Sequence, residues 1–226
     1  MFPKNTVKVL IIFLSVIAAV FFARVMAQRF YENGILKKII TRLEADSRIA
    51  EVLVTAAKYD PAIKKTTTTI KFLEYDVNGK PIAPKYFTFS GNVIQFQSLV
   101  IRFKDIHVES GDSMKGKSAY LFWKAFVLDG RNTQEYEITK LYEVPDGYRT
   151  DKIISPFEED LWKKLWVYAL DQKESDAMGI KNAQIEAPGT KFIPGTLYTI
   201  RIEHDGGIRI DTQILPFILR GEKILE

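Results

Sequence analysis

The hydrophobic pattern of the chain begins with one long uncharged run close to the N-terminus. Residues 9–23 contain no charged side chain. A membrane-spanning helix needs about 20 apolar residues, and basic side chains at its ends can extend their charges to the interface. We therefore expect a short tail at 1–8 and a transmembrane signal anchor at 9–27. The residues that we expect to contact the bilayer are Lys8, Val9, Phe13, Phe21, Phe22 and Arg24.

A cleavable signal peptide is the alternative interpretation of this run. Val25-Met26-Ala27 would be a permissible cleavage site, but Arg24 lies between the apolar run and that site, which favours an uncleaved anchor. Basic residues lie on both sides of the run, so the distribution of positive charge does not fix the orientation. A short tail before a large domain favours a cytoplasmic N-terminus and a periplasmic or extracellular C-terminal domain.

The pattern changes to heptad spacing over residues 28–62, which contain no proline before Pro61. This spacing predicts an amphipathic juxtamembrane helix that ends at Asp60-Pro61, because the residue before proline is disfavoured in a helix. The apolar positions form a candidate oligomer seam, which would join copies of the chain in a short coiled coil. The alternative is that the same stripe packs on the chain's own C-terminal domain. The seam consists of Leu36, Ile40, Leu43 and Val54.

From residue 66 to residue 226 the pattern alternates with period two, and Gly, Pro and Asn-Gly interrupt it at short intervals. This predicts a soluble, mainly β domain, a sandwich or open barrel of eight to ten antiparallel strands with one packed α-helix. We expect that helix at about 156–173, with Ser155 as its N-cap, Pro156 at its first position and Glu158 completing a capping box. We expect a bulge before Ser98.

Two hairpins are predicted in detail. Val77-Asn78-Gly79-Lys80 favours a type I′ turn, followed by an edge strand that starts with prolines. In the last hairpin, pairing Ile202 with Ile210 would place all the isoleucines on one face and oppose residues of opposite charge across the strands.

Charge and cysteine content narrow the class of function. Residues 1–65 hold 11 Lys and Arg against five Asp and Glu, whereas residues 66–226 hold 21 against 23. The basic excess therefore belongs to the N-terminal segment, as suits a segment beside anionic lipid headgroups, and it argues against a nucleic-acid-binding domain. The chain contains no cysteine, which excludes disulfides, thiolate metal sites and a cysteine nucleophile.

The sequence offers little catalytic chemistry. It contains no nucleophile elbow, phosphate loop or dinucleotide fingerprint, so we expect no catalytic residue and no cofactor. His107, His204 and Asp205 are weak candidates for a metal site, since neither histidine has ligand spacing, and solvent-exposed strand ends explain both histidines better.

The function that we expect is a non-enzymatic interaction or scaffold module of the cell envelope, tethered to the membrane. Its expected partners are the lipid bilayer and either another envelope protein or a second copy through the juxtamembrane helix. The alternative is a membrane-tethered glycan-binding module or glycoside hydrolase, which would expose aromatic side chains such as Tyr86, Tyr136, Tyr142 and Tyr148 or pair two carboxylates in a groove.

Overall fold

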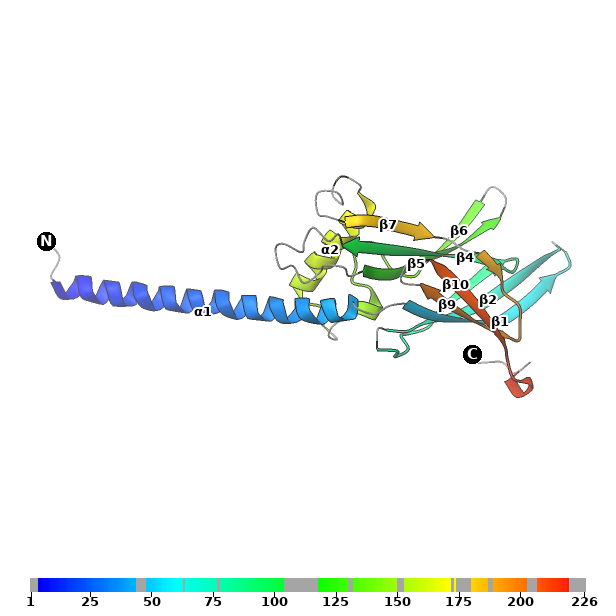
Figure 1. Ribbon diagram of the computed structural model, residues 1–226, viewed down its shortest axis with the longest axis horizontal. Helices are drawn as coiled ribbons and strands as arrows, with labels where there is room; N and C mark the ends of the chain where they lie inside the picture. Colours follow the sequence, from blue (N-terminus) through cyan, green and yellow to red (C-terminus); the bar gives the residue numbers. More distant parts are fainter. Residues whose placement is uncertain are drawn as a thin grey trace. The chain divides into compact units, whose positions relative to one another are not determined.

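The chain divides into two compact units, Met1–Ile39 and Ile40–Glu226. The computed structural model describes residues 4–43, 48–62, 64–76, 78–103, 118–129, 132–149, 153–171, 173, 180–186, 189–202 and 207–219. The described residues of the first unit, 4–39, lie within one helix, and the second unit contains the strands (Figure 1).

The helix α1 (Lys4–Leu43) is continuous through the predicted anchor and beyond it. Its apolar window, Ile12–Glu32, is long and apolar enough to cross a membrane, and none of it is buried. Phe13, Phe21 and Phe22 are each more than 60% exposed. The window begins later than the predicted span at 9–27, because the side chains of residues 9–11 lie outside the described part of the structure.

The second unit is mainly β, with two antiparallel sheets. One sheet has the order β10-β9-β1-β2-β3; the other has the order β6-β5-β4-β7, with the short β8 also on β4. The two sheets form two layers in Figure 1. The described elements after α1 are β1 (Arg48–Asp60), β2 (Lys65–Glu74), β3 (Lys85–Ser90), β4 (Val93–Phe103), β5 (Ser118–Asp129), β6 (Asn132–Glu137), η2 (Asp146–Tyr148), α2 (Pro156–Leu170), β7 (Ile180–Glu186), β8 (Gly189–Lys191), β9 (Thr196–Ile202), β10 (Ile208–Ile214) and η3 (Phe217–Leu219).

The predicted helix over 28–62 is wrong from Arg48 onward, because residues 48–60 form the central strand β1. The segment contains β-branched residues, and its apolar positions also fit period two. Ala50, Val52 and Val54 point into the core, while both edges of β1 form hydrogen-bonded ladders with β2 and β9. Hydrogen bonding and side-chain packing along both edges of β1 favour a strand more than three heptads of apolar spacing favour a helix. The β domain therefore includes residue 48 and does not start at residue 66.

Residues of both sheets meet in one hydrophobic core around Phe72 of β2. Its ring centroid lies 5.4 Å from that of Phe96 on β4 and 5.5 Å from that of Phe122 on β5. Phe87 of β3 packs at 6.0 Å. At one side the Tyr136 hydroxyl of β6 donates to the Thr88 carbonyl oxygen of β3, which joins the edge strands of the two sheets.

The helix α2 covers the other face of the β4-containing sheet. It contacts β4 and β7, and its Trp162, Leu165 and Trp166 are buried. The Trp166 indole N–H donates to the Glu143 carbonyl oxygen over 2.9 Å. The Ser155 hydroxyl accepts from the Glu158 N–H over 3.1 Å, which confirms the predicted N-cap.

The register of β4 with β5 shifts between Gln97 and Ser98, where a bulge was expected. The extra residue belongs to β5, however: Gln97 pairs with Lys124 and Ser98 with Phe122, which leaves Trp123 opposite no residue of β4. The Trp123 carbonyl oxygen accepts from the N–H groups of Ile138 and Thr139. The bulged residue therefore holds the segment that follows β6 in place through these two hydrogen bonds.

Both predicted hairpins close differently. Asp76 N–H donates to the Lys80 carbonyl oxygen, and Gly79 has φ 73° while Asn78 has no positive φ, so the turn is not type I′. The Asp76 carboxylate accepts the N–H of Asn78 and of Lys80, which stabilises the longer loop. In the last hairpin Ile202 pairs with Ile208, two residues from the predicted register. A shift of two residues in the pairing leaves each side chain on the same face of the sheet, so the isoleucines of β9 and β10 still lie on one face.

Candidate functional site

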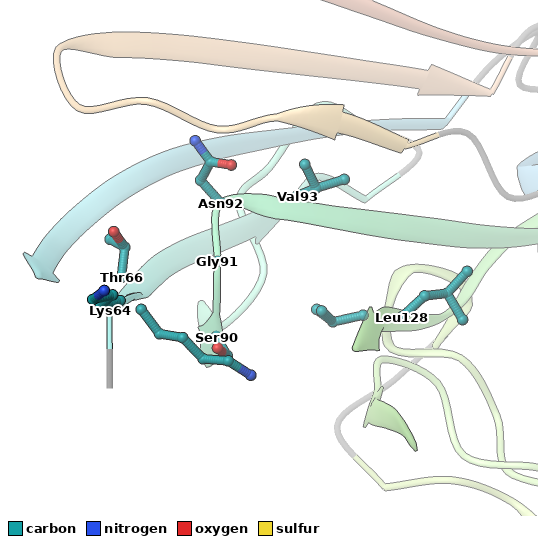
Figure 2. A pocket seen from close by; sticks show the side chains of 9 residues that line it. Lys64, Thr66, Ser90, Gly91, Asn92, Val93 and Leu128 are labelled. Carbon is teal, nitrogen blue, oxygen red and sulfur yellow. The ribbon is translucent and has the colours of Figure 1, made fainter. Parts of the chain in front are cut away.

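A pocket of about 400 Å³ lies at one end of the β domain, which we call the tip end. It is the end where β1 stops, opposite to the end where the chain enters β1 from its N-terminal side. The pocket is formed by the β1–β2 connection, the β3–β4 turn and the last residues of β5 (Figure 2). Its lining residues are Lys64, Lys65, Thr66, Ser90, Gly91, Asn92, Val93, Val127 and Leu128.

Local backbone geometry builds one wall of this tip pocket. The Asp60 carboxylate accepts the Ala62 N–H over 2.9 Å, forming a turn at the end of β1. Lys64 follows in the left-handed region at φ 53° and directs the chain into β2. Left-handed backbone is uncommon for a residue with a side chain. This turn between β1 and β2 brings both Lys64 and Lys65 to the lining of the pocket.

Hydrogen bonds hold the β3–β4 turn against the start of β2. The Gly91 N–H donates to the Thr66 carbonyl oxygen over 2.6 Å. The Thr68 hydroxyl donates to the Gly91 carbonyl oxygen over 2.6 Å. Gly91 has φ 86°, a conformation that glycine adopts at little cost. The pocket is therefore preorganised by backbone bonds on both sides of Gly91.

The lining is cationic and rich in neutral hydrogen-bonding groups. Two lysines, two hydroxyls (Thr66 and Ser90) and the Asn92 amide line the pocket, and none of its nine lining residues is a carboxylate or an imidazole. In Figure 2, Lys64, Thr66 and Ser90 lie on the side of the pocket opposite to Leu128. Lysine ammonium groups, hydroxyls and amides can all donate hydrogen bonds to an oxyanion. A volume of this size falls within the range of small-molecule sites.

Exposed apolar side chains also lie at this end of the domain, before β9 and after β10, which is the edge strand farthest from β3 in its sheet. The Phe192 N–H donates to the carbonyl oxygen of Asn92, a pocket residue, over 2.7 Å, and the Leu215 N–H donates to the Gly195 carbonyl oxygen over 2.9 Å. These bonds tie the segment before β9 and the segment after β10 to the pocket end. Phe217 and Ile218 on η3 are 83% and 80% exposed. We call Ile193, Ile214, Phe217 and Ile218 the tip apolar residues.

A second, smaller pocket of about 220 Å³ lies beside the end of β2 and the segment after β6. Its charged residues have partners. Arg149 and Asp146 form an ion pair at 3.0 Å, and Lys140 and Glu143 form one at 3.5 Å. The Lys85 ammonium donates to the Ile138 carbonyl oxygen over 2.6 Å. The two ion pairs lie within the segment between β6 and α2, and the Lys85 bond connects β3 to the start of that segment, so we assign this pocket a structural role.

The structure brings Glu51 and Tyr75 together elsewhere in the domain. The Tyr75 hydroxyl donates to the Glu51 carboxylate over 2.6 Å. This hydrogen bond, with partial burial and the negative charge of Glu51, raises the pKa of Tyr75 to about 12. Neither Glu51 nor Tyr75 is among the described lining residues of the two pockets above.

The residues predicted as sites have different outcomes. His107, His204 and Asp205, the metal candidates, lie outside the described residues. Among the residues that the structure describes, no three His, Cys, Asp or Glu side chains gather in a metal-binding arrangement.

The structure places the anchor residues and three of the four seam residues on one helix and the fourth seam residue on a strand. Lys8, Val9, Phe13, Phe21, Phe22 and Arg24 all lie on α1. Leu36, Ile40 and Leu43 also lie on α1, although the placement of their side chains is outside the described part. Val54 is buried in β1, so it cannot continue their seam.

Sequence reasoning did not identify the tip pocket. Lys64-Lys65 and Gly91-Asn92 are visible as a basic pair and a turn, but nothing in their spacing indicates that they meet. The aromatic prediction was partly wrong: Tyr86 and Tyr142 are about half exposed, whereas Tyr148 is buried and its hydroxyl accepts from the Tyr120 N–H over 3.0 Å.

No family model matches this chain, and neither a curated protein nor a solved structure matches it.

Proposed function

We propose that this chain is a single-pass membrane protein whose β domain acts as a non-enzymatic interaction or scaffold module of the cell envelope. The observation that carries the proposal is the apolar window of α1, which has no part buried in protein. A fully exposed apolar surface of this length is costly in water, and a lipid bilayer removes that cost. At 1.5 Å per residue, 21 helical residues extend about 30 Å, the thickness of the hydrocarbon core.

The β domain supports an interaction role through its tip end. The tip apolar residues are exposed at the same end of the domain as the pocket, and exposed apolar side chains favour binding to another molecule. The contact of the two sheets through Phe72, Phe96 and Phe122 supports a β-sandwich as the scaffold. The partner is another envelope component or a second copy of the chain, joined through Leu36, Ile40 and Leu43.

The proposed orientation places the N-terminus in the cytoplasm and the β domain in the periplasm or outside the cell. It is testable because the chain has no cysteine, so one introduced cysteine is the sole thiol. We would introduce Asn78→Cys in the exposed β2–β3 turn or Lys8→Cys in the exposed start of α1. An impermeant maleimide would then be added to intact spheroplasts or to permeabilised ones.

Asn78→Cys should be labelled in intact spheroplasts, and Lys8→Cys only after permeabilisation. The opposite result, with Asn78→Cys protected until the membrane is opened, would place the β domain in the cytoplasm and refute its display. Labelling of Asn78→Cys in a chain that is not retained by the membrane would refute the anchor.

A glycan-binding module is the second candidate, favoured by Tyr59. Tyr59 is 59% exposed and pairs with Thr66, a pocket residue, across β1 and β2. Directly paired residues share one face of a sheet, so the tyrosine ring lies on the same face as Thr66. An exposed ring beside hydroxyl and amide groups is suited to a sugar. Binding of neutral oligosaccharides that Tyr59→Ala abolishes would support this candidate; equal binding by the variant would exclude it.

A further inference from the structure

We propose that the edge strand β10 pairs antiparallel with β10 of a second copy of the chain, with the two Ile210 residues opposite each other. The proposal rests on the interaction role proposed above and deepens it, because it names the partner and the strand that binds it. It depends neither on the membrane anchor nor on the orientation of the domain. The contact would join the β10-containing sheets of two copies into one continuous sheet.

The backbone of β10 is suited to accept a further strand. β10 has seven residues and no proline, and it pairs with β9 without a register shift. Within the described part of the chain, β9 is its sole neighbour in the sheet. Edge strands can pair with another chain, and proteins usually prevent this with prolines, bulges or a covering segment. Residues 211–214 are exposed, so this half of β10 is accessible to a partner.

The core is closed at the β3 edge of this sheet and open at the β10 edge. At the β3 edge, the Tyr136 hydroxyl of β6 donates to the Thr88 carbonyl oxygen, and the Tyr136 ring lies 5.1 Å from that of Phe87. At the other edge, Thr212 and Ile214 lie on the core-facing side, since they pair with buried residues of β9. Both are nevertheless exposed. A partner strand would therefore extend the core at β10.

The two faces of β10 match those of a second β10. Ile208 and Ile210 are partly buried against the core. Arg209 and Asp211 lie on the outer face, with side chains that are 57% and 51% exposed. Directly opposite residues of an antiparallel pair share one face of the sheet. A second copy therefore presents apolar side chains to the isoleucines and charged side chains to the charges.

The two charges select one register. With Ile210 opposite Ile210, Arg209 of each copy lies opposite Asp211 of the other, which gives two pairs of unlike charge. Pairing centred on Arg209 or on Asp211 would place like charges directly opposite, which destabilises a sheet. Pairing centred on Thr212 brings neither charge opposite an unlike one. A shift by one residue would set isoleucines against charged side chains.

This arrangement favours a second copy over an unrelated strand. A two-fold contact uses the same surface of both subunits, so each residue and its complement must lie on that surface. Arg209 and Asp211 on either side of Ile210 meet this condition. They already form an ion pair within the strand, at 3.1 Å between Arg209 Nε and Asp211 Oδ2. Main-chain hydrogen bonds would supply the affinity of the contact, and the charges would supply its register.

The first test uses single introduced cysteines in the full chain, purified in detergent, because the chain has none of its own. Ile210→Cys should form a disulfide-linked dimer under mild oxidation, since directly opposite Cα atoms lie about 4.5–5.5 Å apart. Gln213→Cys, on the same strand, is the matched control. In the proposed register its two thiols would be about 20 Å apart, so it should not cross-link.

The second test reverses the charges. Arg209→Asp alone would oppose carboxylates across the contact, and Asp211→Arg alone would oppose guanidinium groups. Each variant should associate about tenfold more weakly than the natural chain in sedimentation velocity. In an equal mixture of the two variants, every opposed pair again has unlike charges, so the dimer should return. An effect confined to one chain would not be reversed by mixing.

Four results would overturn the proposal. They are a natural chain that sediments as a monomer, a dimer that persists in both charge variants, no recovery on mixing, or equal cross-linking of Ile210→Cys and Gln213→Cys. A monomer would leave this edge to an extended segment of another protein. Labelling of Asn78→Cys and Lys8→Cys, and cross-linking of Ile40→Cys in the predicted seam, report the display and the seam separately. Failure of the β10 contact is therefore distinguishable from failure of either.

Discussion

At the scale of single residues, the hydrogen bond between Tyr75 and Glu51 has a measurable effect, because it raises the pKa of the Tyr75 hydroxyl. It joins the end of β2 to the neighbouring strand β1 over 2.6 Å. Its consequence is a tyrosine that stays protonated to higher pH in the folded protein than in the unfolded chain, where its pKa is about 10.

The stability of the β domain should therefore fall as pH rises from about 10 to about 12. Below pH 10 Tyr75 is neutral in both states, and its contribution is fully present. Above pH 10 the unfolded chain loses the proton first, so unfolding becomes more favourable until the folded pKa of about 12 is passed. The free energy of unfolding should depend less on pH over this interval in Tyr75→Phe than in the natural chain.

The control for this prediction is Glu51→Gln. Removing the carboxylate should lower the pKa of Tyr75 toward its ordinary value, as followed by tyrosinate absorbance. A pKa near 12 that persists in Glu51→Gln would show that Glu51 is not the cause.

At the scale of elements, local sequence signals predicted α2, the edge position of β3 and the paired faces of β9 and β10. These features depend on residues close in the chain: a proline and a serine at a helix start, prolines before an edge strand, and alternating isoleucines. The sequence did not predict β1, because its strand identity depends on Thr196–Ile202, almost the whole domain away. The tip pocket was missed for the same reason, since its walls come from segments that only the topology brings together.

The start of α2 gives a prediction at this scale. Ser155→Ala removes the side-chain acceptor of the Glu158 N–H, so we expect the free energy of unfolding to fall by about 1 kcal/mol. Ser155→Asn restores an acceptor and should recover most of that loss. Chemical denaturation of the detergent-solubilised chain, followed by tryptophan fluorescence, reports it because Trp162 and Trp166 lie in this helix. Equal destabilisation by both variants would indicate a packing effect.

At the scale of the whole molecule, the chain combines an apolar helix with a β domain whose core is complete without it. The buried core residues around Phe72 all belong to strands or to the segments between them. The composition agrees with this division, because residues 1–47 hold seven Lys and Arg against three Asp and Glu, whereas residues 48–226 hold 25 of each kind.

The membrane anchor gives the prediction that belongs to this scale. Ile17→Lys places a charge in the middle of the apolar run, at a cost of roughly 3 kcal/mol for insertion. It should shift the chain from the carbonate-resistant membrane fraction toward the soluble fraction. Gly34→Lys, which lies beyond both the predicted span at 9–27 and the apolar window Ile12–Glu32, should remain in the membrane. If the mature chain in the membrane fraction begins after Ala27 by mass spectrometry, the segment is a cleaved signal peptide and the anchor is refuted.

The position of β1 in its sheet also determines when the protein can finish folding. β1 is the first strand to be synthesised, yet one of its edges pairs with β9, which is among the last strands. Until β9 has been made, that edge presents unpaired N–H and C=O groups. A chain that lacks β9 therefore leaves one edge of β1 unpaired, and truncation before Thr196 should leave a product prone to aggregation and proteolysis. The β domain can thus complete its fold only when about the last seventh of the chain has been made.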